Sequence, residues 1–406
     1  MSDSPESGVA GSPGDARPGT PKRRGSGNTR DTVGTVVLAS VVVLALVTGL
    51  GVVFLYRHLN GNITVQDVSS ALGDERPDKV EDTGPREPIN VLVMGSDTRD
   101  CDGCDLDNEG GAEASDTTLL FHLSADRERA YGISIPRDSI VDRPACGADD
   151  EIPGERGAMW NAAYTEGGQA CTIRQFEELT GVYVDHYVVV NFAGFKDMVN
   201  AIDGVEVCIP EDINDPAHGI NIDAGTRTLR DAEALNYVRA RYTLGDGSDI
   251  SRIKRQQAFV ASMVKKVVSA GTLTRVDRLV GFLDAATESL TVDPGLENVT
   301  KIGQLGLGFQ GIGLDKIQFL TVPNAYYPAD SQYAGRVYWT KDAPLLWRRI
   351  ASDEPLPQSL LGSAISAAAP PGDASGQQGK KGKGKPPTPQ ERAEAEAAAA
   401  QDGLCA

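Results

Sequence analysis

The chain has 406 residues and a formal net charge of -18 at pH 7, from 57 acidic and 39 basic side chains. An acidic surplus of this size argues against general binding to nucleic acid, whose phosphate backbone attracts positive charge. The length would allow two average domains, but both ends are poor in large apolar residues, so only the middle is expected to build a hydrophobic core.

The first element in the chain is an apolar stretch from Val33 to Tyr56. A helix of this length crosses about 30 Å of hydrocarbon. The stretch exceeds the apolar core of a cleaved signal peptide, about 7 to 15 residues, so we expect a retained single-pass anchor. Only Arg57 follows it closely, whereas the basic residues Lys22, Arg23, Arg24 and Arg30 come shortly before it. The positive-inside rule therefore predicts a disordered cytoplasmic segment, residues 1–32, and an extracytoplasmic remainder.

Residues 57–88 mix charged residues with Pro and Gly, which is typical of a linker. Apolar runs then predict strands at 89–94, 117–123, 130–135, 187–192, 204–209 and 316–321. Helical spacing predicts helices at 160–165, 172–180, 195–202, 279–286 and 299–307. This order indicates one α/β domain with a mixed sheet over residues 89–355, followed by a disordered low-complexity tail over 356–406.

The six cysteines of an exported chain are expected to form disulfides. Cys101 and Cys104 lie in an acidic loop, where a short-loop disulfide is favoured over a zinc or redox site, because acidic neighbours disfavour the thiolate. Cys146 and Cys171 are the first guess for another pair, since both lie in irregular segments. Spacing alone does not fix the pairing, and Cys405 lies in the tail.

A run of arginines follows residue 236. Arg239 and Arg241 alternate along residues 236–241, which read as the end of a strand, so both guanidiniums are predicted to point to one side. A Gly-rich turn comes next. Asp249 then begins a segment whose apolar residues recur at helical spacing, so we expect a helix there.

On that helix Arg252, Arg255 and Gln256 fall on one face. The planar fork of arginine donates paired hydrogen bonds to phosphate oxygens and stays charged at any working pH. Two pairs of arginines beside one short turn therefore predict a site for a multiply charged phosphate such as pyrophosphate. The alternative interpretation is a solvated helix face whose arginines pair with nearby carboxylates.

Further charged residues stand at or beside the ends of the early strands: Asp97, Arg99, Asp116, Arg137 and Asp138. Mg²⁺ prefers carboxylates together with phosphate oxygens and water, so Asp97 and Asp116 are candidate metal ligands. Capping of a turn, or pairing with a nearby arginine, explains either aspartate equally well. The acidic loop 105–116 has partial EF-hand spacing, but it lacks flanking helices and ends in Asp, so we interpret it as a solvated loop.

Five ordered motifs resemble the signatures of the LytR-CpsA-Psr family, in its actinobacterial type. They are Asn90–Arg99, Ser115–Leu120, Ser134–Ser139, Asn161–Tyr164 with Gly167–Gly168, and Arg239–Arg241 continued by Arg252–Gln257. The resemblance implies an α/β/α sandwich with a central mixed sheet flanked by helices, behind one N-terminal transmembrane helix. It also implies a membrane-anchored ligase that moves a glycopolymer from a polyprenyl-pyrophosphate carrier to peptidoglycan as a phosphodiester, with Mg²⁺.

Carried over by motif, the resemblance implies that Asp97 and Asp116 hold Mg²⁺. It implies that the pyrophosphate is gripped by Arg99, Arg137, Arg239, Arg241, Arg252, Arg255 and Gln256. Asp249 would orient an arginine, and either Asp97 or Asp249 would accept the proton of the attacking hydroxyl. The family often has Arg where this chain has Ala114. Candidates for a tunnel that takes the lipid tail, which ordinary core packing also explains, are Val188, Val190, Phe192, Phe195 and Val199.

Two other functions fit the same residues. A polyprenyl-pyrophosphate hydrolase would bind the pyrophosphate with the same residues but transfer the phosphoryl group to water. A non-catalytic cell-envelope regulator or attenuator would bind without turnover, although the chain carries no DNA-binding motif and its working part is predicted to lie outside the membrane. The sequence does not tell which polymer or which acceptor hydroxyl would be used.

Overall fold

The computed structural model describes residues 29–73, 75–80, 86–96, 115–216, 220–240, 244–269, 276–309, 311–372 and 396–405. The chain divides into two compact units, Met1–Leu55 and Tyr56–Ala406. Helix α1 (Thr29–Asn62) contains the apolar stretch. Within the described residues it is the one helix long and apolar enough to cross a membrane, so the predicted apolar helix is confirmed.

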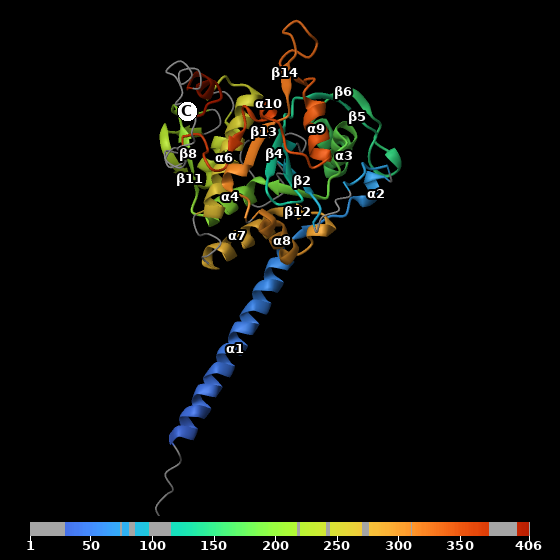
Figure 1. The fold of residues 1–406 in the computed structure, drawn as a ribbon. Coiled ribbons are helices and arrows are strands. Elements are labelled where there is room, and N and C mark those ends of the chain that lie inside the picture. Colours follow the sequence, from blue (N-terminus) through green and yellow to red (C-terminus); the bar gives the residue numbers. More distant parts are fainter. Residues whose placement is uncertain are drawn as a thin grey trace, which may run out of the picture. The chain divides into compact units, whose positions relative to one another are not determined.

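The second unit is built on an eight-stranded mixed sheet with strand order β1-β12-β7-β2-β3-β4-β13-β16. The strands are β1 (Thr64–Val65), β2 (Ile89–Ser96), β3 (Ser115–Leu123), β4 (Ala130–Ile135), β7 (His186–Asn191), β12 (Leu290–Val292), β13 (Ile317–Thr321) and β16 (Ile365–Ser366). β3 pairs antiparallel with β2 and β4, whereas β2 and β7, and β4 and β13, are parallel. Helices pack on both faces (Figure 1), so the predicted α/β sandwich with a mixed sheet is confirmed.

The remaining helices are α2 (Ser69–Leu72), α3 (Ala162–Thr180), α4 (Phe192–Ala201), α5 (Asp231–Arg239), α6 (Asp249–Ser269), α7 (Val276–Ser289), α8 (Val299–Phe309), α9 (Ala343–Ala351) and α10 (Gln358–Leu361). Four strand pairs lie outside the main sheet. They are built from β5 (Ile140–Arg143), β6 (Glu155–Met159), β8 (Val205–Ile209), β9 (Ile213–Asp215), β10 (Ile220–Ile222), β11 (Gly225–Leu229), β14 (Asn324–Tyr326) and β15 (Val337–Trp339). Short 3-10 helices occupy Ala148–Asp150, Pro294–Leu296 and Leu314–Lys316.

The two faces of the sheet are covered to different extents. Leu92 and Leu120 lie opposite each other and are fully buried in the core shared with α3 and α9. Successive residues of a strand point to opposite faces, so Val93 and its partner Val188 belong to the other face. There Val93, Val188 and Val190 are only partly buried. That face therefore keeps accessible apolar surface.

The structure corrects the strand predicted at residues 236–241. This segment ends helix α5, with Arg239 in its last turn. Asp231 and Glu233 occupy the first turn of α5, where carboxylates offset the positive end of the helix dipole. A short apolar run fits a strand or a helix equally well, which is why the alternation at Arg239 was misread. Arg241 lies outside the described residues.

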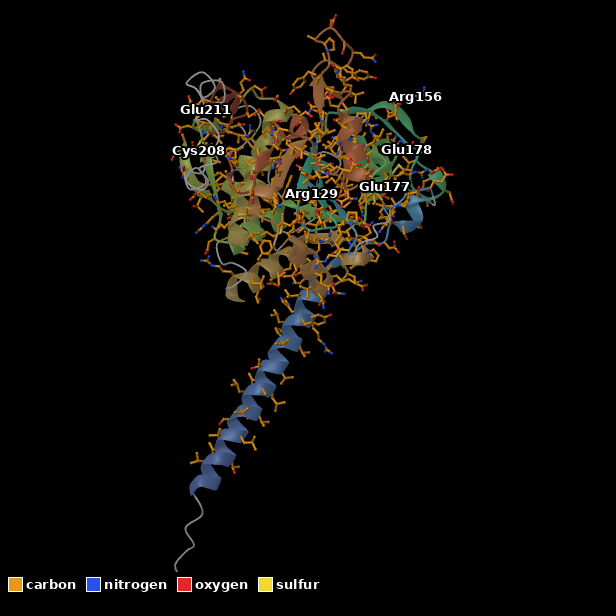
Figure 2. The ribbon with its side chains drawn as sticks, viewed as in Figure 1. Arg129, Arg156, Glu177, Glu178, Cys208 and Glu211 are labelled. Atoms are coloured by element: carbon orange, nitrogen blue, oxygen red, sulfur yellow. A yellow bond between two sulfur atoms is a disulfide. The ribbon has the colours of Figure 1, made fainter. Side chains whose placement is uncertain are left out.

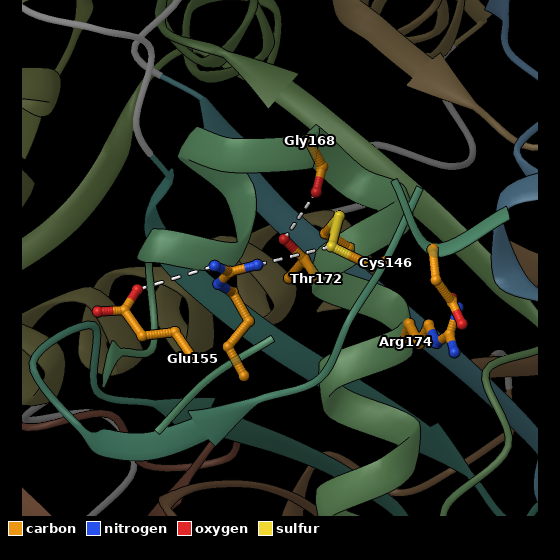
Figure 3. Close-up of a disulfide and its surroundings, with 8 residues drawn as sticks. Cys146, Glu155, Gly168, Thr172 and Arg174 are labelled. Carbon is orange, nitrogen blue, oxygen red and sulfur yellow. Dashed lines mark hydrogen bonds and ion pairs between the residues drawn. A yellow bond between two sulfur atoms is a disulfide. The ribbon is translucent and has the colours of Figure 1, made fainter. Parts of the chain in front are cut away.

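The predicted disulfide between Cys146 and Cys171 is confirmed and fixes α3 to the segment after β5 (Figure 3). Gly167 and Gly168 leave helical geometry inside α3, so the two helices predicted here are confirmed as two helical segments that meet at a kink. A Cβ on Gly167 would lie 2.0 Å from the Cys171 sulfur, so only glycine fits at that position. Cys101 and Cys104 lie outside the described residues.

The prediction of a disordered tail over residues 356–406 is wrong for its described parts. β16 pairs with β13 in the main sheet. Leu404 is 6% exposed and packs in the cluster that contains Ala258 of α6. Cys405 forms a disulfide with Cys208 of β8, so the C-terminal end lies beside that strand (Figures 1 and 2). The composition of the segment did not predict these contacts, because one cysteine and one leucine hardly change its average composition.

Asp353 gives the folded domain a pH-dependent contact. Burial by itself raises the pKa of Asp353, but hydrogen bonds from His122 and the Ala125 amide and the charge of Arg129 outweigh burial, so the pKa is lowered. A lowered folded-state pKa means that the stabilisation is present above the unfolded value and is lost as the pH falls through the folded value. We therefore expect Asp353→Asn to lower the free energy of unfolding by about 1 to 3 kcal/mol at pH 7.

Urea denaturation of the wild type and Asp353→Asn across pH 2 to 7 measures this. The difference between the two proteins should shrink once the pH drops below about 4, the ordinary pKa of an aspartate. A difference that stays constant down to pH 2 would contradict the assignment.

Candidate functional site

Five side chains of alternating charge run from β15 to the start of α6. Arg336 Nη1 lies 2.8 Å from Asp138 Oδ1. Arg137 Nε lies 4.0 Å from the same Asp138 oxygen and 3.7 Å from Asp249 Oδ1. Arg252 forms a short ion pair with that Asp249 oxygen. Asp138, Asp249 and Arg252 are at most 7% exposed. Buried charges are stable only when opposite charges neutralise them. These five side chains, which we call the charge row, therefore hold their arginines in fixed positions.

Local sequence explains why these groups meet. Arg137 lies two residues after Ile135, the last residue of strand β4. Ser248 precedes α6, and its hydroxyl accepts a hydrogen bond from the Ser251 amide at 3.1 Å, which caps the helix. Asp249 and Arg252 then occupy the first turn of α6. The carboxylate of Asp249 thus lies between two arginines supplied by different elements.

Two more predicted residues join the site from α5 and α6. The Arg239 guanidinium lies over the Phe192 ring, 4.9 Å from its centre. The Gln256 amide donates to the Val238 carbonyl at 3.1 Å and its oxygen accepts from the Thr117 hydroxyl at 3.4 Å. Gln256 therefore links α5 to β3 by hydrogen bonds. Arg239, the residue after Val238, stacks on Phe192 at the end of α5.

Arg255 has a different place from the predicted phosphate-binding face. It is fully buried, and its guanidinium donates to the carbonyls of Ala240 and Leu244, the latter at 3.2 Å. Burial lowers the pKa of Arg255 to about 10, so it stays charged at neutral pH. Its bonds fix the backbone at Ala240 and at Leu244. The geometry indicates that Arg255 positions the turn at residues 244–247, directly before α6.

The candidate metal ligands are only partly located. Asp97, Arg99, Ala114 and the acidic loop lie outside the described residues, as does the side chain of Asp116. The β2–β3 register pairs Ser96 with Ser115, which directly adjoin Asp97 and Asp116 in the chain. The backbone thus brings Ser96 and Ser115 together at one end of neighbouring strands.

The lipid-tail candidates differ in burial. Val199 is fully buried in a core cluster and is ordinary core. The other four are only partly buried: Val188, Val190, Phe192 and Phe195. Two of them belong to the less covered face of the sheet.

Arg336 and Tyr326 were missed by sequence reasoning. Arg336 contacts Asp138 across 198 residues of chain, and no motif surrounds it. Tyr326 interacts with Ser248 and with the backbone of Ile250, and burial against α6 raises its pKa. A run of four tyrosines between residues 326 and 338 was the one sequence signal available for this region.

Known proteins share this sequence and fold. The chain is 32% identical to the cell wall biosynthesis protein LcpA of Corynebacterium glutamicum, over 71% of this chain and 59% of that protein. It is 28% identical to TagU of Enterococcus faecalis, named a polyisoprenyl-teichoic acid–peptidoglycan teichoic acid transferase, over 62% of this chain and 78% of that protein.

The solved structure of the LytR-Csp2A-Psr enzyme from Actinomyces oris supports the fold. It superposes with a TM-score of 0.52 at 20% identity and covers 71% of this chain and 96% of that one. The chain spans between 52% and 59% of the length of the two corynebacterial relatives that it matches. Residues 55–348 match the LytR_cpsA_psr family. The chain therefore belongs to the LytR-CpsA-Psr family.

Proposed function

We propose that the protein is a membrane-anchored phosphotransferase that moves a glycopolymer from a polyprenyl-pyrophosphate carrier to peptidoglycan in cell-wall assembly. The observation that carries the proposal is Asp249 between Arg137 and Arg252, in a family whose relatives include named teichoic acid transferases. The basic residues before the apolar span support a cytoplasmic N-terminus and a site on the outer side of the membrane.

The arginines supply electrostatic stabilisation. Charge develops on the phosphoryl oxygens in the transition state, and guanidiniums that already stand in place stabilise it without reorienting. Asp249 limits the movement of Arg137 and Arg252, and Arg255 keeps the neighbouring turn in position. Removal of water from the site strengthens each of these contacts. The site thus favours the transition state over the bound donor.

The transfer itself exchanges one P–O bond for another. The acceptor hydroxyl attacks the phosphorus nearest the glycan, and a new P–O bond forms to the acceptor. The bond to the bridging oxygen breaks, which releases polyprenyl phosphate. The hydroxyl proton passes to a carboxylate, for which Asp97 and Asp249 are the two candidates. Asp249 is the one of these whose place among the arginines is described.

Mg²⁺ is proposed as the cofactor, held by Asp97 and Asp116. Carboxylate oxygens suit this hard cation, and the pairing of Ser96 with Ser115, which adjoin the two aspartates in the chain, supports the proposal. When bound, Mg²⁺ supplies charge neutralisation on the pyrophosphate oxygens. The partly buried apolar residues Val188, Val190 and Phe192 are proposed to contact the polyprenyl chain.

Metal dependence gives a direct prediction. EDTA is expected to abolish transfer and added Mg²⁺ to restore it. Asp116→Asn should lower kcat/KM by about 100-fold or more, because a bound metal contributes several kcal/mol of charge stabilisation. Initial rates at increasing Mg²⁺ measure both effects. Full activity of Asp116→Asn in EDTA would remove Asp116 and the metal from the proposal.

The whole function is tested with the full-length chain in detergent, a short polyprenyl-pyrophosphate glycan and peptidoglycan fragments. A glycan–peptidoglycan phosphodiester, identified by mass spectrometry, is the expected product. Release of glycan phosphate to water regardless of acceptor would identify a hydrolase instead. Donor binding without any turnover would favour a regulator of the cell envelope.

A further inference from the structure

The hairpin β14–β15 exposes aromatic side chains that have no role in the transfer to peptidoglycan as proposed above. Apart from α1, four large apolar side chains of the described residues are exposed, and two of them, Tyr326 at 46% and Tyr338 at 38%, belong to this hairpin. The ring centre of Tyr327 lies 5.1 Å from those of both Tyr333 and Tyr338. Tyr327 and Tyr333 are partly buried and Tyr338 is exposed, so the cluster reaches the surface. Aromatic clusters that reach the surface mark interaction surfaces more often than packing needs.

The base of this hairpin is fastened to the arginine site. The Val337 amide donates to the Asp138 carbonyl at 3.2 Å, and Arg336 pairs with the Asp138 carboxylate. Asp138 in turn lies beside Arg137. On the opposite strand Tyr326 interacts with Ser248, directly before Asp249. Each strand of the hairpin therefore contacts a residue that adjoins the groups proposed to hold the pyrophosphate.

The hairpin also lies on the side of the folded unit opposite to α7 and α8 (Figure 1). The amide of Val299, the first residue of α8, donates to the side chain of Asn60 at 2.8 Å, and Asn60 lies near the end of α1. In the chain Asn60 comes shortly after the apolar stretch, so we assign the end that carries it to the lipid-linked donor and the hairpin side to the acceptor.

The chemistry of the hairpin suits uncharged sugar rings. A tyrosine offers a flat apolar face with one hydroxyl, and it loses little conformational entropy on binding because it has two side-chain torsions. A sugar ring offers C–H groups on a face and hydroxyls around its rim, which matches that pattern. Between residues 326 and 338 the charged residues are Asp330 and Arg336, and Arg336 is paired with Asp138. A nearly neutral platform disfavours an anionic polymer.

We propose that the β14–β15 hairpin binds the glycan strand of the acceptor, with the rings of Tyr327 and Tyr338 as its platform. The inference rests on the proposed transferase function, because it assigns a place to that reaction's second substrate. In this arrangement the hairpin presents a sugar hydroxyl to the phosphorus held by Arg137. Tyr326 lies between the platform and α6 and limits how the bound strand is oriented.

The test uses the full-length protein in detergent and the double variant Tyr327→Ala/Tyr338→Ala. The KM for peptidoglycan fragments is expected to rise about tenfold or more, as for truncation of aromatic anchors in other interfaces, while the KM for the donor is unchanged. Tyr338→Phe keeps the ring and should retain most acceptor affinity. Leu307→Ala is the matched control, since Leu307 is 61% exposed on α8, away from the hairpin.

A binding measurement separates this inference from the proposed function. Soluble glycan strands from peptidoglycan are titrated against the wild type and the double variant, and saturation-transfer NMR reports contact without turnover. Binding that the double variant loses, even in the absence of transferase activity, supports the acceptor site and makes only the proposed function fail. Overturning results are an unchanged KM for acceptor in a folded double variant, an increase confined to the donor KM, or an equal loss in Leu307→Ala.

Discussion

Replacing Arg137 by alanine is expected to lower kcat/KM for glycopolymer transfer by about 100- to 1,000-fold, the usual cost of removing one positioned donor from a transition-state site. Arg137 occupies the centre of the charge row, between Asp138 and Asp249. Its loss removes one phosphate-binding group and also leaves the two nearly buried carboxylates with one cation fewer. Both consequences weaken stabilisation of the phosphoryl group in the transition state.

The Arg137→Ala rate is to be compared with those of Arg137→Lys and Arg156→Ala. Lysine restores the charge but not the paired donors of the guanidinium, so it should recover only part of the activity. Arg156 is exposed on β6 (Figure 2), and its removal should leave kcat/KM unchanged. Thermal unfolding of each variant shows whether the fold is retained. A folded Arg137→Ala protein with wild-type kcat/KM would remove Arg137 from the site.

Opening the Cys208–Cys405 disulfide is expected to lower the free energy of unfolding by about 3 to 5 kcal/mol, since it closes a long loop in the unfolded chain. The two cysteines are 197 residues apart in sequence. The C-terminal segment that Cys405 anchors also contacts the turn before α6. The Gln401 carbonyl accepts from the Asp246 amide at 2.9 Å, and a Cβ on Gly403 would lie 2.9 Å from Leu244.

Because Arg255 holds this same turn from inside, release of the C-terminal segment should affect donor binding as well as stability. We expect Cys405→Ser to raise the KM for the donor by about tenfold, since small misplacements of binding groups have large kinetic effects. The control is Cys146→Ser/Cys171→Ser, which removes a disulfide between α3 and the segment after β5. That variant should lose stability with an unchanged donor KM. Equal changes of donor KM in both would contradict a specific role of the C-terminal segment.

Periodic patterns and ordered motifs in the sequence were enough to predict the single apolar span, the strands β2 to β4, helix α6 and the family. Each of these depends on neighbours close in the chain. A buried strand needs a continuous apolar run, and the start of α6 needs only Ser248 and Asp249 ahead of helical spacing. The arginines of the last motif were likewise recognised by type and order. Local chemistry was therefore sufficient for the fold class and for most candidate residues.

The tertiary structure alone decided which of these residues meet. It showed that residues 236–239 are helical, that Arg255 holds a turn, and that Arg336 joins Asp138 across 198 residues. It also anchored the tail through Cys405, where composition predicted disorder. These contacts depend on the packing of elements distant in sequence, and a guanidinium has the same chemistry whether it faces a ligand or a backbone carbonyl. Burial and partner geometry distinguish the two, and both arise only when the chain is folded.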